Sequence, residues 1–191
     1  MINKIFNIQY SISNYSRGFT ILESIVAIAV LSLSVSGAFS AVTQSLSQAT
    51  IAKDEVKAFY LAQEAIEVIR NKRDANQLSL LNTGSGFWLA GIAQYDTDPC
   101  YFEKVCQIDA NPIPPTLVYC NSSSWGSCAY LKQNPTTFMY NYTTGTATNF
   151  KREIKIESVN ANEVAIIVRV SWTKGIITRE FKIKSYLFNW I

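Results

Sequence analysis

Glu23 is the residue with the most unusual chemical setting in this chain of 191 residues. It is the only charged residue between Phe19 and Val42, where 16 of 24 residues are apolar, and the next charge, Lys53, follows an uncharged gap of 29 residues. A carboxylate inside a membrane-spanning helix costs about 2.5 to 3.5 kcal/mol on insertion scales. Glu23 therefore either lies close enough to the membrane surface to stay hydrated or pairs with a cation, and we favour pairing.

Other candidates for reactive chemistry are few. The chain has no histidine, which excludes Ser-His-Asp and Cys-His nucleophile systems, histidine-ligated zinc and histidine proton shuttling. No paired-carboxylate or nucleophile motif takes their place, so we expect no catalytic residue, no metal and no cofactor. The net charge is +3, from 17 basic and 14 acidic residues, which is too small to mark a nucleic-acid binder.

The apolar stretch at residues 19–42 is long enough to span a membrane. As a helix rising 1.5 Å per residue it is about 36 Å long, against a hydrocarbon core of about 30 Å. A secretory signal peptide has a shorter apolar stretch of about 7 to 15 residues, whereas a signal anchor has the observed length. Lys4 and Arg17 are the only charges before the stretch, so we expect the amino terminus to stay in the cytoplasm.

The residues around Glu23 are more specific than the length of the stretch. The sequence RGFTILE, which ends at Glu23, resembles the processing site of the type IV prepilin family. The resemblance implies that a basic leader, residues 1–18, is cleaved after Gly18 and that Phe19 becomes the N-methylated amino terminus. It also implies that Glu23 is the glutamate that this family retains at the fifth mature position.

The motif has a physical interpretation as well. Gly18 has no side chain, so a protease at the membrane edge can approach the backbone closely. Cleavage creates a positive amine at Phe19, and the amine of an incoming subunit can pair with Glu23 of a subunit already assembled. Each charge is costly in lipid when alone, so this pairing would favour assembly and fix the axial register.

The helix is expected to continue beyond the membrane. Over residues 43–75 apolar side chains recur at spacings of three and four, which makes this segment amphipathic. These side chains are Val56, Phe59, Ala62, Ile66 and Ile69. No proline occurs before Pro99, so one helix can run from about Phe19 to about Asp74. Many major pilins carry a proline where this chain has Ser40, so the chain looks more like minor pilins and pseudopilins.

Residues 76–150 are rich in turn-forming residues and contain all four cysteines. The spacing of the cysteines does not fit the Cys-x2-4-Cys pattern of zinc sites, and export across the membrane would place them in an oxidising compartment. We therefore expect two disulfides. Pairing of Cys100 with Cys106 and of Cys120 with Cys128 is favoured, with crossed pairings left open.

Residues 151–191 are predicted to form antiparallel strands. Apolar residues alternate with charged ones or form a β-branched run, and Thr173–Gly175 is a candidate hairpin turn. The apolar face of such a sheet needs a cover, which the amphipathic part of the helix supplies. The fold class is therefore α+β: a long amino-terminal transmembrane and amphipathic helix packed on a small carboxyl-terminal antiparallel β-sheet, the ladle fold of pilins.

We expect five segments in this architecture. They are a cleaved leader at 1–18, a transmembrane and assembly helix at 19–42, its amphipathic continuation at 43–75, a loop-rich disulfide-bearing region at 76–150 and an antiparallel sheet at 151–191.

The resemblance implies a structural subunit, a minor pilin or pseudopilin of a type IV pilus or type II secretion-like filament. Its partners would be other pilin or pseudopilin subunits, a prepilin peptidase, an inner-membrane assembly platform and membrane lipid. The leader would be cytoplasmic and the head extracytoplasmic before assembly, and the subunit would then enter a pilus or periplasmic pseudopilus.

The alternative is a single-pass, membrane-anchored ligand-binding or DNA-capturing protein that uses the helix only as a tether. Nucleic acid is disfavoured by the weak net charge. Five basic residues could nevertheless gather on one face of the sheet. They are Lys151, Arg152, Lys155, Lys182 and Lys184.

Overall fold

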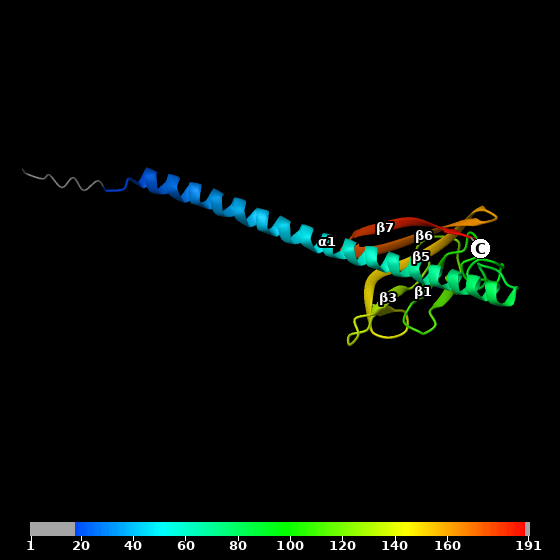
Figure 1. Ribbon diagram of the computed structural model, residues 1–191. Helices are drawn as coiled ribbons and strands as arrows, with labels where there is room; N and C mark the ends of the chain where they lie inside the picture. The colour runs from blue at the N-terminus through cyan, green and yellow to red at the C-terminus, as the bar shows by residue number, and fades with distance from the viewer. Residues whose placement is uncertain (1–17, 190–191) are drawn as a thin grey trace, which may run out of the picture. The chain divides into compact units, whose positions relative to one another are not determined.

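The computed structural model describes residues 18–189, which contain one helix and seven strands (Figure 1). The elements are α1 (Ile21–Thr83), β1 (Cys106–Asp109), β2 (Thr116–Tyr119), β3 (Tyr130–Gln133), β4 (Tyr140–Asn141), β5 (Thr146–Asn160), β6 (Glu163–Lys174) and β7 (Ile177–Phe188). All of the expected leader except Gly18 lies outside the described residues. The chain divides into two compact units, the first ending at Ala49 and the second beginning at Thr50.

The described part of the first unit contains the start of helix α1. Every residue from 18 to 49 is exposed, including large apolar side chains such as Leu31, Leu33 and Phe39. By length and composition this helix is able to cross a membrane. Apolar surface on this scale is typical of a segment that contacts lipid or other proteins.

The second unit is an α+β head in which the rest of α1 covers one face of an antiparallel sheet (Figure 1). The helix buries a stripe of residues at spacings of three and four against that sheet. They are Ala58, Leu61, Ala62, Ala65, Ile66, Ile69, Arg73 and Gln77. This confirms the predicted arrangement of the fold, a long amino-terminal helix on a carboxyl-terminal antiparallel sheet.

The buried stripe is rotated relative to the predicted one. Ala62, Ile66 and Ile69 are buried as expected, but Val56 and Phe59 remain 54% and 37% exposed. Alanines occupy three of the buried positions, and their small side chains let the helix backbone approach the sheet closely. The larger side chains of Val56 and Phe59 lie to the side of this contact.

Strand β5 is the branch point of the sheet. One edge pairs with β6, which in turn pairs with β7, and the other edge pairs with β1 and with β3 at different levels. Every pairing is antiparallel. Strands β1 to β4 fall in the segment predicted to be loop-rich, where each is only two to four residues long. Short strands of this kind give little periodicity to detect in a sequence.

Two boundaries differ from the prediction. Helix α1 ends at Thr83 and not near Asp74, because Gly84 adopts a φ of 68° and its N–H bonds to the carbonyl oxygen of Leu80, a glycine-terminated helix end. The loop between β6 and β7 is formed by Gly175 and Ile176 alone, so the predicted Thr173–Gly175 turn is displaced toward the carboxyl end.

Candidate functional site

Helix α1 begins with a side-chain cap at Thr20. The Thr20 hydroxyl accepts a hydrogen bond from the N–H of Glu23 at 3.2 Å, and the Thr20 carbonyl accepts one from the N–H of Ser24 at 3.1 Å. Thr20 and Glu23 therefore have the T-x-x-E spacing of a capping box. A carboxylate in the first turn also complements the positive end of the helix dipole. The sequence analysis missed this cap, although a threonine three residues before a glutamate is its signal.

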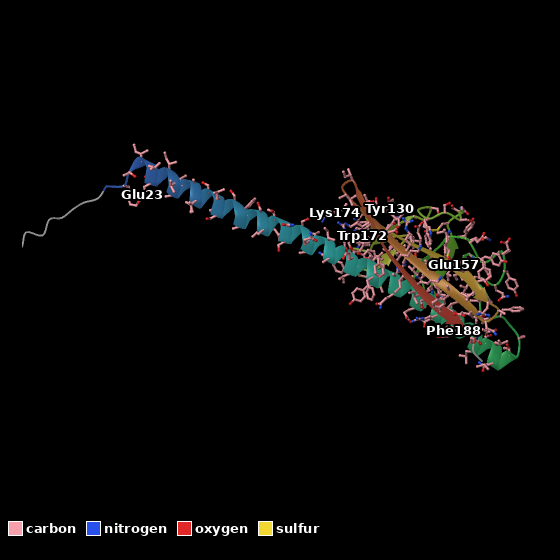
Figure 2. All side chains as sticks on the ribbon, turned by 90° about the horizontal axis from the view of Figure 1, so that it is seen from above. Glu23, Tyr130, Glu157, Trp172, Lys174 and Phe188 are labelled. Carbon is pink, nitrogen blue, oxygen red and sulfur yellow. A yellow bond between two sulfur atoms is a disulfide. The ribbon has the colours of Figure 1, made fainter. Side chains whose placement is uncertain are left out.

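Glu23 lies on the first turn of α1, where its side chain points away from the helix (Figure 2). Within residues 18–189, no basic side chain forms a salt bridge with its carboxylate. Phe19 is 79% exposed, and a Cβ added to Gly18 would meet no atom within 4 Å. Within residues 18–189, the fold therefore neither requires glycine at position 18 nor provides a cation for Glu23.

Residues 13–39 match the model of the prokaryotic N-terminal methylation motif. This motif indicates a type IV prepilin-like protein. Comparison with curated proteins gives no match, and comparison with solved structures gives none either. The motif spans Gly18, Phe19 and Glu23, and the α+β arrangement of this prepilin-like chain resembles the pilin fold.

Two disulfides cross-link segments of the prepilin-like head. One joins Cys100 and Cys106, with a Cα–Cα distance of 5.2 Å, and the other joins Cys120 and Cys128 at 5.0 Å. Cys100 and Cys106 are fully buried in the core beside α1, whereas the second disulfide closes a loop, residues 120–128, on the opposite face of the sheet. Both loops lie in the region of the shortest strands, where each covalent link restricts the unfolded chain.

Arg152 of β5 fastens α1 to the sheet. Its side chain is fully buried, forms an ion pair with Glu64 of α1, and donates hydrogen bonds to the carbonyl oxygens of Leu61 at 3.2 Å and Ile108 at 2.6 Å. One guanidinium group therefore joins α1, β5 and β1. A planar, multidentate donor of this kind suits a buried position in which several acceptors converge.

The expectation that Arg152 shares a face with Lys151 and Lys155 is wrong. Successive side chains of a strand point to opposite faces, so Arg152 lies on the helix-covered face with Ile154 and Ile156. The same alternation was visible in the sequence, because Arg152 is two residues before Ile154. This contact is the functional feature of the head that the sequence analysis missed.

Glu153 has the complementary role on the other face. Its carboxylate is fully buried and accepts hydrogen bonds from the backbone N–H groups of Gly126 at 2.7 Å and Cys128 at 3.2 Å. Arg169 approaches it to 3.6 Å. Glu153 thus holds the disulfide-closed loop 120–128 against the sheet.

Trp125, from that loop, lies among cations of the outer face. Lys155, Lys182 and Arg169 lie 5.2, 5.5 and 5.9 Å from its ring centroid, within cation–π range. The face also carries acids: Arg169 pairs with Glu180 at 2.7 Å. Lys184 likewise pairs with Glu157 at 3.2 Å. The basic residues predicted to gather here do so without Arg152, in a surface of mixed charge.

Tyr142 is packed beside the Arg152 contact. Its hydroxyl donates to the carbonyl oxygen of Arg152 at 3.2 Å. Burial raises the pKa of the Tyr142 phenol above its ordinary value of 10.0, and the nearby Arg152 guanidinium offsets part of that rise. The folded head therefore favours the neutral phenol.

Proposed function

We propose that this type IV pilin-like chain is a minor pilin or pseudopilin, a structural subunit of a type IV pilus or a type II secretion-like filament. The observation that supports the proposal is the methylation motif at the start of helix α1, together with the exposure of every residue from 18 to 49. A tether needs only to cross the membrane, whereas an assembly helix must also present a surface to neighbouring subunits.

The proposed sequence of events begins with the leader, residues 1–18, on the cytoplasmic side. A prepilin peptidase hydrolyses the peptide bond between Gly18 and Phe19, which leaves a carboxylate on the leader and an amine on Phe19. One methyl group is then transferred to that amine from an electrophilic methyl donor, and the amine nitrogen loses one proton. At an inner-membrane assembly platform, the amine pairs with Glu23 of a neighbouring subunit, and segments 19–42 and 43–75 pack into the filament.

The Thr20 cap supports this order of events. It holds the first turn of α1 in helical form, so the carboxylate of Glu23 lies one turn from the new amino terminus. A neighbouring amine would therefore meet a charge whose backbone is already ordered. The disulfide-bearing region 76–150 and the sheet at 151–191 would form the extracytoplasmic head, which takes no part in this pairing.

Mass spectrometry of the protein purified from its native membrane tests the proposal. We expect the loss of residues 1–18, one added methyl group on Phe19 and the absence of four cysteine hydrogens. A Gly18→Val variant should keep its leader and stay out of filaments. Gly37→Val is the matched control, because Gly37 also has no atom within 4 Å of an added Cβ and should still be processed. Mature filaments built from Gly18→Val would contradict the cleavage site.

A further inference from the structure

A cavity of about 360 Å³ lies in the head between the segment that follows α1 and the turn that joins β5 and β6. We call it the Phe102 cleft, because Phe102 forms part of its wall. Asn189 also lines the cleft and accepts a hydrogen bond from Gln77 at 2.8 Å, which places the cleft beside the last turns of α1. Figure 1 shows the end of α1 and the loops that follow it at one end of the head. The volume is within the range of small-molecule sites, about 300 to 1000 Å³.

The lining of the Phe102 cleft combines aromatic rings with uncharged polar groups. The rings are those of Phe87, Trp88 and Phe102, and the polar side chains are those of Gln94, Ser158, Asn160 and Asn189. Among residues 18–189, no charged side chain lines the cleft. Amide and hydroxyl groups both donate and accept hydrogen bonds. The cleft therefore suits a ligand with apolar faces and several uncharged polar groups.

Some of these lining groups have no role in holding the fold together. In the part of the chain that the structure describes, the side chains of Gln94 and Ser158 form no hydrogen bond. The ring of Phe87 is 51% exposed and touches only the edge of the cleft's surroundings through Tyr95, at 5.8 Å between ring centroids. A ligand can bind these groups without breaking a hydrogen bond of the head.

The wall that follows α1 is fixed in position by contacts of its backbone. The side-chain amide of Asn76 donates a hydrogen bond to the carbonyl oxygen of Trp88 at 3.1 Å. The carboxylate of Asp98 accepts hydrogen bonds from the N–H groups of Gln94 at 2.8 Å and Tyr95 at 2.9 Å. These contacts order the backbone of Trp88 and Gln94 before any ligand binds.

The other walls are held as firmly. Phe102 lies within the loop closed by the disulfide at residues 100–106. The side chain of Asn189 accepts the bond from Gln77 and donates one to the side chain of Asn162 at 3.3 Å, which fixes the orientation of its amide. Binding to a site that is already ordered loses less conformational entropy.

A second cavity, of about 690 Å³, adjoins the first and shares Phe102 and Ser158 with it. Charged side chains occur only in the lining of this second cavity, where Glu103, Lys155 and Glu157 are present. The pair of cavities gives room for a second unit of a chain-like ligand.

We propose that the Phe102 cleft binds a neutral carbohydrate. A sugar ring has an apolar C–H face that packs on an aromatic ring, and its hydroxyl groups donate and accept hydrogen bonds as the amides of the cleft do. An anionic ligand would find no cation in this lining, and a wholly apolar one would cover Gln94 and Ser158 without giving them hydrogen-bond partners. The inference concerns the head alone and does not depend on filament assembly.

Saturation-transfer NMR with the full chain tests this proposal. The chain is kept in micelles of lauryldimethylamine oxide, because this detergent has no sugar headgroup. The probes are the methyl glycosides of glucose, galactose, mannose, N-acetylglucosamine and N-acetylgalactosamine, with methyl glucuronide as the anionic comparison. We expect saturation transfer to the ring C–H protons of at least one neutral glycoside, with a dissociation constant of about 1 mM.

Two variants locate the binding site. Gln94→Ala removes an amide and Phe87→Ala removes a half-exposed ring, and each should weaken binding about tenfold. Gln63→Ala and Phe138→Ala are the matched controls, because Gln63 and Phe138 are exposed and line neither cavity. The controls should bind as the parent does. Urea unfolding midpoints show that all four variants remain folded.

Four outcomes would overturn the proposal. The first is no transfer to any neutral glycoside at about 20 mM. The second is binding that both Gln94→Ala and Phe87→Ala leave unchanged, because the sugar would then lie elsewhere. The third is tighter binding of methyl glucuronide than of methyl glucoside, lost in about 0.5 M salt, which would identify an anion site. The fourth is binding of an uncharged peptide, N-acetyl-alanyl-serine amide, without binding of any glycoside.

Discussion

Helix α1 contains two regions that share one backbone and differ in what surrounds them. From Ile21 to residue 50 no described side chain is buried, although most are apolar. From Ala58 to Gln77 the helix buries a stripe against the sheet and carries charges on its other faces. Both regions are regular helix, so backbone geometry does not separate them.

The difference shows where each region obtains its stability. The head half of α1 is covered by residues of its own chain, including the Arg152 contact, so its folding is complete within one subunit. The amino-terminal half has exposed apolar surface of the kind that contacts lipid or other chains. A substitution in the amino-terminal half should therefore affect assembly, and one in the head half should affect the free energy of unfolding.

The largest expected effect is on assembly, from Glu23→Val. The variant should be processed and inserted as the parent is, because the apolar stretch becomes more apolar, yet its incorporation into filaments should fall to a small fraction. Counting subunits in sheared filaments against total membrane protein measures this. Ser24→Val, which leaves the carboxylate in place, is the control. Normal incorporation of Glu23→Val would contradict the proposed pairing of Glu23 with a neighbouring amine.

Arg152→Ala should have the largest effect on the head. It removes a buried cation and leaves the carbonyl oxygens of Leu61 and Ile108 without this donor, so we expect a loss of about 3 to 5 kcal/mol in the free energy of unfolding. Urea unfolding of the full chain in detergent micelles, followed by tryptophan fluorescence, measures it. Lys151→Ala, the neighbour on the other face, should cost less than about 1 kcal/mol. Similar losses for both would show that Arg152 does not fasten α1 to the sheet.

A pair of alanine substitutions compares the two regions of α1 directly. Ala62→Leu places a large side chain in a fully buried position and should destabilise the head by about 1 to 3 kcal/mol. Ala41→Leu makes the same change on the exposed region and should leave the unfolding of the head unchanged. The same urea titrations test both variants. Equal destabilisation would mean that the two regions are not energetically distinct.

The smallest effect concerns pH and Tyr142. Because the folded state raises the pKa of the phenol, burial of its neutral form stabilises the head below about pH 10, and this contribution is lost as the pH rises through the folded pKa. Tyr142→Phe should unfold with a shallower dependence on pH above 10 than the parent. Urea titrations between pH 8 and pH 11 measure the slope. A slope unchanged by the substitution would refute the contribution of Tyr142.

The features that the sequence predicted are those encoded over short spans. The apolar stretch, the RGFTILE motif, the amphipathic stripe and the long alternating strands each occupy consecutive residues, so periodicity and composition indicate them. The motif match and the α+β arrangement confirm the family resemblance and the fold class.

The features that the sequence did not predict depend on distant residues. Arg152 and Glu64 are 88 positions apart, and no local sequence pattern indicates that they form an ion pair. The predicted end of α1 near Asp74 is too early. Arg70, Lys72 and Arg73 have the basic character of a last helical turn, but Arg73 instead bonds to the carbonyl oxygen of Phe188, 115 positions away. Tertiary contacts override local helix signals in such cases.

The adjacent burial of Arg152 and Glu153 also has a consequence for how the strands find their partners. A shift of β5 by one residue would exchange the two side chains between the faces of the sheet. Glu153 would then face the carboxylate of Glu64, and Arg152 would face the backbone N–H groups of Gly126 and Cys128. Like charge would oppose like charge on one face, and donors would oppose donors on the other. Arg152 and Glu153 therefore destabilise the shifted register on both faces of the sheet, which favours correct alignment of β5 during folding.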